Sequence, residues 1–316
     1  MSTDERVGLL FPGQGSQSVG MGRELAERHP EAREAFQEAD DALGFALSRL
    51  CWEGPEDELT LTSNAQPALL AHSVAAWRVL RVAGLDPTVA AGHSLGEFSA
   101  YVAAGSMGFA DAVRTVRRRG ELMLQSGRDR PGTMAAVLGL DDDVVEGVCH
   151  EASIEDSVVV AANFNSPGQV VVSGDVDAVE RASALLVSAG AKKVSALNVS
   201  GAFHSPLMAP AEEGLRAHLD GVEFGAPAFP VISNVTASPV SDAGEARLLL
   251  VQQLTSTVRW TDSVRTMLQL GVTRFLEVGP GKVLTGMLKR IDRAAEGRGV
   301  PLGTPEAIEA FLQQRG

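Results

Sequence analysis

The sequence predicts an α/β protein in which a small ferredoxin-like subdomain is inserted into a larger domain built on a parallel sheet. From residue 7 to about residue 128, helical patterns such as "SVAAWRVLRVAG" alternate with short apolar runs, as in parallel α/β sheets. Between Thr133 and Val199 the order becomes β-α-β-β-α-β, the ferredoxin-like arrangement. We therefore assign residues 1–130 and 200–316 to the larger domain and residues 131–199 to the subdomain.

The elements of the inserted segment follow in a clear order. "TMAAVLGL" is typical of a strand and "DDDVVEGVCHEA" of a helix, and "VVVAANFNSPGQVVVSG" predicts a hairpin that turns at Ser166-Pro167-Gly168. "AVERASALLVSAG" then predicts a helix and "KKVSALNV" a strand. After this segment, "FPVISNV" and "TRFLEVGPG" are expected to add strands to the first sheet, before a final helix in "PEAIEAFLQQ".

Composition narrows the function classes. The 316 residues are 45% hydrophobic and 21% charged, which is typical of a soluble globular protein. The net charge of −13 argues against nucleic acid or an anionic membrane as the main partner. The start "MSTDERVGLL" lacks a targeting pattern and no apolar run is long enough to span a bilayer, so we expect a cytoplasmic protein. We also expect a monomer. The only cysteines, Cys51 and Cys149, are far apart and indicate buried thiols, with neither a disulfide framework nor a zinc site.

The stretch "TVAAGHSLGEFSAYVAAG" places Ser94 where a buried strand gives way to a helix. Gly92 and Gly96 leave room around it, as in the G-x-S-x-G elbow that exposes a nucleophilic serine. The backbone N–H groups after such a serine can stabilise an oxyanion. Taken alone, the pattern is equally compatible with a turn that is merely bracketed by glycines.

A serine nucleophile needs a base, and His204 is the best of six histidines. It lies in "NVSGAFHSPLM", a loop bracketed by glycine and proline directly after a predicted strand. No carboxylate stands out as a third catalytic member, and a backbone carbonyl could fix the imidazole tautomer instead. Of the remaining histidines, we expect His29, His150 and His218 on the surface and His72 in the core. His93 is next to Ser94 in the chain, so its side chain should point away from the serine.

Arg119 lies on the apolar face of the predicted helix "FADAVRTVRRRGELMLQ", in one stripe with Phe109, Ala112, Val116 and Met123. A buried guanidinium stays charged and costs several kcal/mol without an anion. Its partner could equally be a structural Asp or Glu or the carboxylate of a ligand. In the second case the pocket would select acyl groups that carry a free carboxylate.

Six motifs occur together in the order of a known family: "FPGQGSQ", "GHSLGE", "RRRGELM", "NFNSPGQVVVSG", "SGAFHS" and "QQLTSTVRW". On these motifs the chain resembles the malonyl-CoA:acyl carrier protein transacylases, the acyltransferase family of fatty acid and polyketide synthesis. The resemblance extends from "GLLFPGQGSQSVGMG" to "FLEVGPGKVL". It implies an α/β-hydrolase-like fold for the larger domain, in agreement with the elements predicted above.

The resemblance also implies roles for individual residues. Ser94 would be the nucleophile, His204 its base and Arg119 the ligand of the malonyl carboxylate. The oxyanion hole would consist of the backbone N–H groups of Gln14 and Leu95.

Three further positions follow from the same resemblance. Gln253 would orient the histidine through its backbone carbonyl. Thr257 stands where the family often has proline, a change expected to loosen this loop without removing a functional group. Leu95 and Phe203 are typical of malonyl-specific members, and Phe203 would fill the space that an α-methyl group needs, for a discrimination of about 1–3 kcal/mol.

The implied reaction is transfer of a malonyl group from malonyl-CoA to an acyl carrier protein through a malonyl-serine ester, without a metal or bound cofactor. A polyketide synthase carrier is the alternative to a fatty acid synthesis carrier, and a serine esterase or a non-catalytic carrier-binding subunit are alternatives of other classes. The carrier is typically acidic, so a local basic surface should dock it. The candidates are Arg114, Arg117 and Arg118, followed by Lys192 and Lys193.

Overall fold

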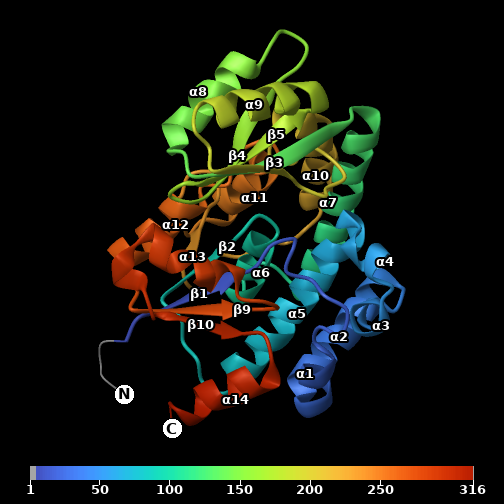
Figure 1. The fold of residues 1–316 in the computed structure, drawn as a ribbon. Coiled ribbons are helices and arrows are strands. Elements are labelled where there is room, and N and C mark those ends of the chain that lie inside the picture. The colour runs from blue at the N-terminus through green and yellow to red at the C-terminus, as the bar shows by residue number, and fades with distance from the viewer. Residues whose placement is uncertain (1–4, 316) are drawn as a thin grey trace.

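The computed structural model describes residues 5–315 and contains two β-sheets (Figure 1). Residues 1–4, which belong to the segment examined above for a targeting pattern, lie outside the described residues. The larger sheet has the strand order β10-β9-β1-β2-β7-β8, and the smaller has the order β4-β5-β3-β6. The strands are β1 (Val7–Phe11), β2 (Val89–Gly92), β3 (Gly132–Leu138), β4 (Val159–Ser166), β5 (Gln169–Asp175), β6 (Lys193–Ala196), β7 (Val231–Ile232), β8 (Pro239–Val240), β9 (Arg274–Val278) and β10 (Gly299–Leu302).

Helices cover both faces of the larger sheet and one face of the smaller sheet. The α-helices are α1 (Arg23–Arg28), α2 (Pro30–Leu43), α3 (Leu47–Glu53), α4 (Glu56–Thr60), α5 (Thr62–Val82), α6 (Gly96–Ala103), α7 (Phe109–Asp129), α8 (Asp142–Ala152), α9 (Val176–Ser188), α10 (Ala209–Leu219), α11 (Ala243–Gln252), α12 (Trp260–Gln269), α13 (Val283–Ile291) and α14 (Pro305–Gln313). Two short 3-10 turns are η1 (Pro206–Met208) and η2 (Arg293–Ala295). Within residues 5–315, none of the helices combines the length and the apolar character needed to cross a bilayer.

The larger sheet is parallel except at β8, which pairs antiparallel with β7 at one edge. All five residues of β1 are buried, because helices cover both faces of a parallel sheet. Leu9 and Phe11 pack in a core with residues of α2, α5, α6 and α7. Leu10, on the other face, packs with residues of α12 and α13. The alternation along β1 therefore separates two helical layers.

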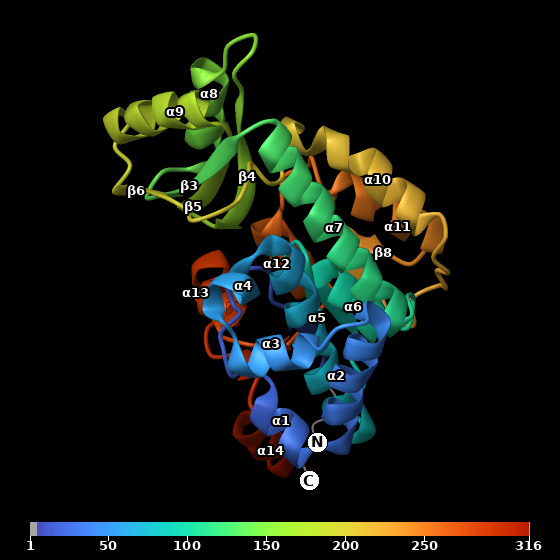
Figure 2. The ribbon, with the colours of Figure 1, turned by 90° about the vertical axis from the view of Figure 1, so that its right-hand side faces the viewer.

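The smaller sheet has the element order β3-α8-β4-β5-α9-β6, which confirms the predicted ferredoxin-like arrangement. Ala135 and Val137 of β3 face a separate core under α8 and α9. Met134, on the opposite face, belongs to the main core of the protein. Figures 1 and 2 show α8 and α9 on the outer side of this sheet. Its inner face is therefore available to form a wall above the larger sheet.

The final helix, whose packing the sequence left open, contacts α1, α5 and β10. Ile308 and Phe311 insert into the main core from α14. The two cysteines, Cys51 and Cys149, are buried and unpaired, as the sequence predicts.

His72 is buried in α5 with 2% of its surface exposed, and its Nε2 lies 2.9 Å from the carbonyl oxygen of Gly303. Burial lowers the pKa of His72 from 6.5 to about 4. The unfolded chain therefore binds a proton at pH 5 that the folded protein excludes, so stability falls as the pH drops below 6.5. We expect this one histidine to account for a loss of about 2 kcal/mol in unfolding free energy between pH 7 and pH 5.

Denaturant unfolding of His72→Gln at the two pH values measures this contribution. Glutamine can still donate to Gly303 but does not titrate, so the difference between pH 7 and pH 5 should shrink by about that amount. His150→Gln, at an exposed histidine of α8, is the matched control and should leave the difference unchanged. Equal pH sensitivity of wild type and His72→Gln would contradict the assignment.

Candidate active site

Ser94 lies in the turn between β2 and α6. Its backbone φ is 51°, a value that residues other than glycine rarely adopt. The flanking glycines are required by close backbone contacts. A Cβ atom on Gly92 would lie 1.9 Å from the carbonyl carbon of Gly96, and one on Gly96 would lie 2.1 Å from the carbonyl oxygen of Phe11. The glycine bracket thus allows helix α6 to begin directly against the ends of β1 and β2.

Asn234, in the loop after β7, clamps this turn. Its Oδ1 accepts a hydrogen bond of 2.7 Å from the Ser94 backbone N–H, and its Nδ2 donates one of 2.7 Å to the Gly92 carbonyl. Both ends of the carboxamide are therefore committed to holding the strained backbone at Ser94.

His204 supplies the imidazole next to Ser94. It is 4% exposed, and its Nε2 lies 2.8 Å from the Ser94 Oγ. Its Nδ1 lies 2.8 Å from the backbone carbonyl oxygen of Gln253. Because a carbonyl only accepts, Nδ1 carries the proton and Nε2 presents a lone pair to the serine hydroxyl. Burial, reinforced by the charge of Arg119, lowers the pKa of His204 to about 3, so the ring is neutral at pH 7.

The other histidines do not compete for Ser94. His93 turns its Nε2 to the Oδ1 of Asn165, 2.8 Å away, as expected from its position next to the serine. His150 is exposed, whereas His29 and His218 are half-buried, which is a less open setting than the surface position predicted for them.

Arg119 is 1% exposed, in the buried stripe of α7 that the sequence predicts. Its Nη1 donates to the Oε1 of Gln66 at 2.7 Å, and its Nη2 donates to the Oε1 of Gln253 at 2.9 Å and to the Ser94 Oγ at 3.2 Å. Among the described residues Arg119 forms no ion pair with a carboxylate, so the structural acid considered above is not in contact with it. The guanidinium therefore reaches the serine with only neutral oxygen atoms as partners.

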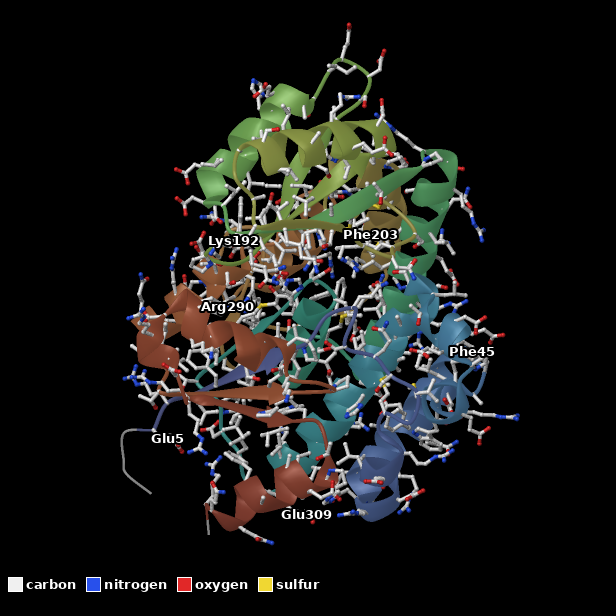
Figure 3. The ribbon with its side chains drawn as sticks, viewed as in Figure 1. Glu5, Phe45, Lys192, Phe203, Arg290 and Glu309 are labelled. Atoms are coloured by element: carbon white, nitrogen blue, oxygen red, sulfur yellow. The ribbon has the colours of Figure 1, made fainter. Side chains whose placement is uncertain are left out.

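A cavity of about 340 Å³ opens over these groups and is lined by both parts of the molecule. Ser94, Arg119 and His204 come from the side of the larger sheet, whereas Met134 and Val171 come from the inner face of the smaller sheet. Phe203 also lines the cavity, and Figure 3 places it at the junction of the two parts. A larger cavity of about 710 Å³ lies near the start of α1 and contains none of the candidate catalytic residues.

Gln14 and Leu95 line the same cavity. Among the described residues neither backbone N–H has a hydrogen-bond acceptor, so both donors remain free. The loop that carries Gln14 runs so close to the elbow that a Cβ atom on Gly13 would lie 2.6 Å from the His93 carbonyl oxygen. Two free donors near the candidate nucleophile are suited to stabilise an oxyanion.

The loop that carries Gln253 is anchored at Thr257, where we expected loosening. The Thr257 hydroxyl donates to the carbonyl of Ala161 at 2.7 Å, and the next residue, Val258, donates its N–H to Ala162 at 2.8 Å. Threonine thus replaces the rigidity of proline with a hydrogen bond to β4.

Three residues of this site were missed in the sequence: Gln66, Glu97 and Asn234. Gln66 lies among apolar residues of α5, a polar side chain on a buried stripe that could have been noticed. Glu97 resembles an ordinary acidic residue in the first turn of a helix. No local pattern distinguishes Asn234, because its partners lie about 140 residues away in the sequence.

Comparisons with known proteins find relatives along nearly the whole chain. Residues 9–301 match the family model described as the acyl transferase domain. The malonyl CoA-acyl carrier protein transacylase of Bacillus subtilis (strain 168) is 46% identical over 308 residues, covering 98% of this chain and 96% of the relative. The protein of the same name from Escherichia coli (strain K12) is 47% identical over 306 residues, covering 96% of this chain and 98% of the relative.

Solved structures extend the similarity to the fold. An acyl carrier protein S-malonyltransferase from Vibrio cholerae superposes with a TM-score of 0.93 at 45% identity, over 97% of this chain and 100% of the other. A malonyl-transacylase in complex with its type II polyketide synthase acyl-carrier protein superposes with a TM-score of 0.94 at 42% identity, over 98% of this chain and 100% of the other. The α/β-hydrolase-like sheet with a small inserted subdomain is thus shared along the whole chain.

Proposed function

Because this chain belongs to the acyl transferase family, we propose that it transfers the malonyl group of malonyl-CoA to the phosphopantetheine thiol of an acyl carrier protein, in support of fatty acid synthesis. One observation carries the choice of acyl group. The Arg119 guanidinium is buried without a carboxylate partner, and it lies 3.2 Å from the Ser94 Oγ. A malonyl group attached to that oxygen has its carboxylate within reach of the guanidinium, whereas an acetyl group leaves the charge unpaired.

In the first half-reaction, the Nε2 of His204 takes the proton of the Ser94 hydroxyl, and the oxygen attacks the thioester carbonyl of malonyl-CoA. The negative charge of the tetrahedral intermediate is stabilised by the backbone N–H groups of Gln14 and Leu95. The intermediate then collapses, the carbon–sulfur bond breaks, and the CoA sulfur takes the proton from His204. The product is a malonyl ester on Ser94.

In the second half-reaction, the thiol of the carrier protein gives its proton to His204, and the sulfur attacks the ester carbonyl. The Ser94 oxygen leaves and regains the proton from His204, which restores the free enzyme. Gln253 keeps the imidazole in the required tautomer in both halves through its backbone carbonyl, and Arg119 holds the malonyl carboxylate throughout. Proton transfer and charge stabilisation are thus assigned to side chains and backbone of this chain, and the proposed reaction steps use no cofactor.

The cavity lies between the two parts of the molecule, and we propose that each part contributes different groups to the site. We assign nucleophile, base and carboxylate ligand to residues 1–130 and 200–316, and the opposite wall of the acyl pocket to residues 131–199. Phe203 narrows the pocket beside the nucleophile and is proposed to disfavour an α-methyl substituent, by about 1–3 kcal/mol.

Incubation with malonyl-CoA and a phosphopantetheinylated acyl carrier protein tests the proposal. Mass spectrometry of the products should show malonyl-carrier protein as the main product, with little free malonate. A serine esterase would share Ser94 and His204 but would release malonate, so malonate as the main product would favour that class. No acyl transfer at all would favour a carrier-binding subunit.

A polyketide synthase carrier is a second candidate acceptor, favoured by the similarity to the transacylase that was solved in complex with such a carrier. Comparison of kcat/KM for a fatty acid carrier and a polyketide carrier distinguishes the two. The chemistry at Ser94 is the same in both cases.

Two basic surfaces could dock an acidic carrier: the arginines of α7, and Lys192 with Lys193. The lysine surface is the better candidate. On α7, Arg114 pairs with Asp111 at 2.7 Å, and Arg117 pairs with Glu121 at 2.7 Å, so their charges are largely compensated locally. Arg118 lies 3.8 Å from the same glutamate. Carboxylates next to these arginines reduce the attraction for another acidic protein.

Lys192 and Lys193 are exposed, and among the described residues neither forms an ion pair. Arg290 of α13 donates a hydrogen bond to Gln169, the first residue after the hairpin turn. Gly168 in that turn accepts a hydrogen bond from Gly139, and the side chain of Lys192 lies beside Gly139 (Figure 3). Lysines of one part thus lie near an arginine of the other. Strand β6 runs from Lys193 towards Leu197, which lines the cavity about 13 Å further along an extended chain.

Reversing the charge of the lysine pair with Lys192→Glu/Lys193→Glu should raise the apparent KM for carrier protein by about tenfold. Acylation of Ser94 by malonyl-CoA without carrier should be unchanged. Arg114→Glu/Arg118→Glu, an equally large charge reversal on α7, should have a smaller effect on this KM. A larger effect of the α7 variant would move the docking surface to α7, and equal loss of both half-reactions in the lysine variant would exclude the lysine surface.

A further inference from the structure

Glu97 is a buried acid that the mechanism above does not use. It is 0% exposed in the first turn of α6, three residues after the nucleophile. Its Oε2 accepts hydrogen bonds from the Nε2 of Gln253 at 2.7 Å and from the backbone N–H of Asn234 at 3.1 Å. Burying a carboxylate in a protein core costs free energy unless hydrogen bonds or opposite charges compensate, so the contacts of Glu97 need an explanation.

The Gln253 side chain lies between this acid and the guanidinium of Arg119. Its Oε1 accepts from Arg119 at 2.9 Å, and its Nε2 donates to Glu97 and, at 3.0 Å, to the Ser94 carbonyl. With a cation on one side and an acceptor on the other, the carboxamide has a single favourable orientation. Rotated by half a turn, its NH2 group would face the guanidinium and its oxygen would face the carboxylate.

Gln253 therefore contacts all three residues whose side chains are proposed to carry out proton transfer, nucleophilic attack and carboxylate binding. Its backbone carbonyl accepts from His204, its Oε1 holds Arg119, and its Nε2 holds the carbonyl of Ser94. Glu97 does not contact Arg119 through a hydrogen bond, but its charge acts on it: burial lowers the pKa of Arg119, Glu97 partly opposes this, and the resulting pKa is about 10. Glu97 is thus linked to Arg119 through Gln253, and to the turn at Ser94 through the backbone N–H of Asn234.

We propose that Glu97 is a positioning residue for malonyl selectivity: its Oε2 fixes the orientation of the Gln253 carboxamide, which in turn holds Arg119 against the nucleophile. This inference rests on the proposed function, because it assigns Glu97 to the carboxylate pocket of that reaction. Burial raises the pKa of Glu97 to about 7, and the hydrogen bonds from Gln253 and Asn234 oppose the rise. Glutamine at this position could accept both hydrogen bonds through its own oxygen, whereas methionine could accept neither.

The experiment compares Glu97→Gln with Glu97→Met at pH 8. The measured quantity is the ratio of the acylation rate constants, kcat/KM, for malonyl-CoA and acetyl-CoA, obtained from the mass of the acyl-enzyme after rapid quenching. Glu97→Gln should keep the ratio within about threefold of wild type, and Glu97→Met should lower it by about tenfold or more, since buried donors lose their acceptor. Ser99→Ala, at another buried residue of α6, is the control and should match wild type.

A second variant keeps the test decisive if Glu97→Met does not fold. Gln253→Met retains the backbone carbonyl on His204 but removes the carboxamide, so it should lower the ratio at least as much. In that background, where the neighbouring side chain is also apolar, adding Glu97→Met should lower the ratio little further, because Glu97 acts through the missing carboxamide.

The outcomes separate the inference from the proposed function. A normal malonyl to acetyl ratio in Glu97→Met or Gln253→Met would overturn the positioning role while leaving the transfer reaction intact. Equal loss in Glu97→Gln and Glu97→Met would also overturn it, because the hydrogen-bond acceptor would then not be the relevant property. Failure of wild-type protein to form a malonyl ester would reject the proposed function itself.

Discussion

Replacing Ser94 by alanine is expected to abolish the malonyl adduct and to lower transfer to the carrier protein by about 10⁴-fold to 10⁶-fold. The reason is chemical: among the described residues, the Ser94 Oγ is the hydroxyl oxygen at the elbow, and it lies 2.8 Å from the Nε2 of a neutral imidazole. Intact mass spectrometry after brief exposure to malonyl-CoA measures the adduct directly.

His204→Ala should reduce acylation by a comparable factor, and the double variant should lose little more, since the two side chains act as one unit. Ser99→Ala is the matched control, a serine-to-alanine change at a buried position of α6, the helix that follows the Ser94 turn. An adduct of full mass in Ser94→Ala would show that another residue is the nucleophile and that the elbow is structural.

Arg119→Ala is expected to invert the acyl preference of the site. Loss of the guanidinium should lower acylation by malonyl-CoA by about 10³-fold, within the 2–5 kcal/mol that removal of one partner from a buried charged pair costs. Acylation by acetyl-CoA should fall much less, because an acetyl group has no carboxylate to pair with the arginine. Parallel measurement of both acyl adducts by mass gives the ratio.

Arg118→Ala provides the control for charge and helix position, since this neighbour is on the exposed side of α7 and lies 3.8 Å from Glu121. It should leave both rates unchanged. Arg119→Lys should restore only part of the malonyl rate, because an ammonium group cannot bind a carboxylate through two parallel hydrogen bonds. If malonyl and acetyl acylation fall together in Arg119→Ala, the arginine is a structural residue of the site and does not select the acyl group.

The sequence by itself determined the features that depend on neighbours along the chain. The elbow at Ser94 follows from two glycines at fixed spacing, and the buried position of Arg119 follows from the helical stripe of α7. The ferredoxin-like order of elements follows from the alternation of strand and helix patterns between β3 and β6. In each case the determining interaction is local, so the spacing of residue types suffices to predict it.

Only the tertiary structure decided which groups meet at the site. Arg119 could have paired with an acid, and the fold instead gives it the carboxamides of Gln66 and Gln253, which are 53 and 134 residues away. The clamp from Asn234 and the contact between Glu97 and Gln253 join segments about 140 to 160 residues apart. The contact of Asn234 with Ser94 depends on the parallel pairing of β2 and β7, which brings the carboxyl ends of both strands to one edge of the sheet. The contact of Arg119 with Gln66 depends on the packing of α7 against α5. No periodicity in the chain encodes either proximity.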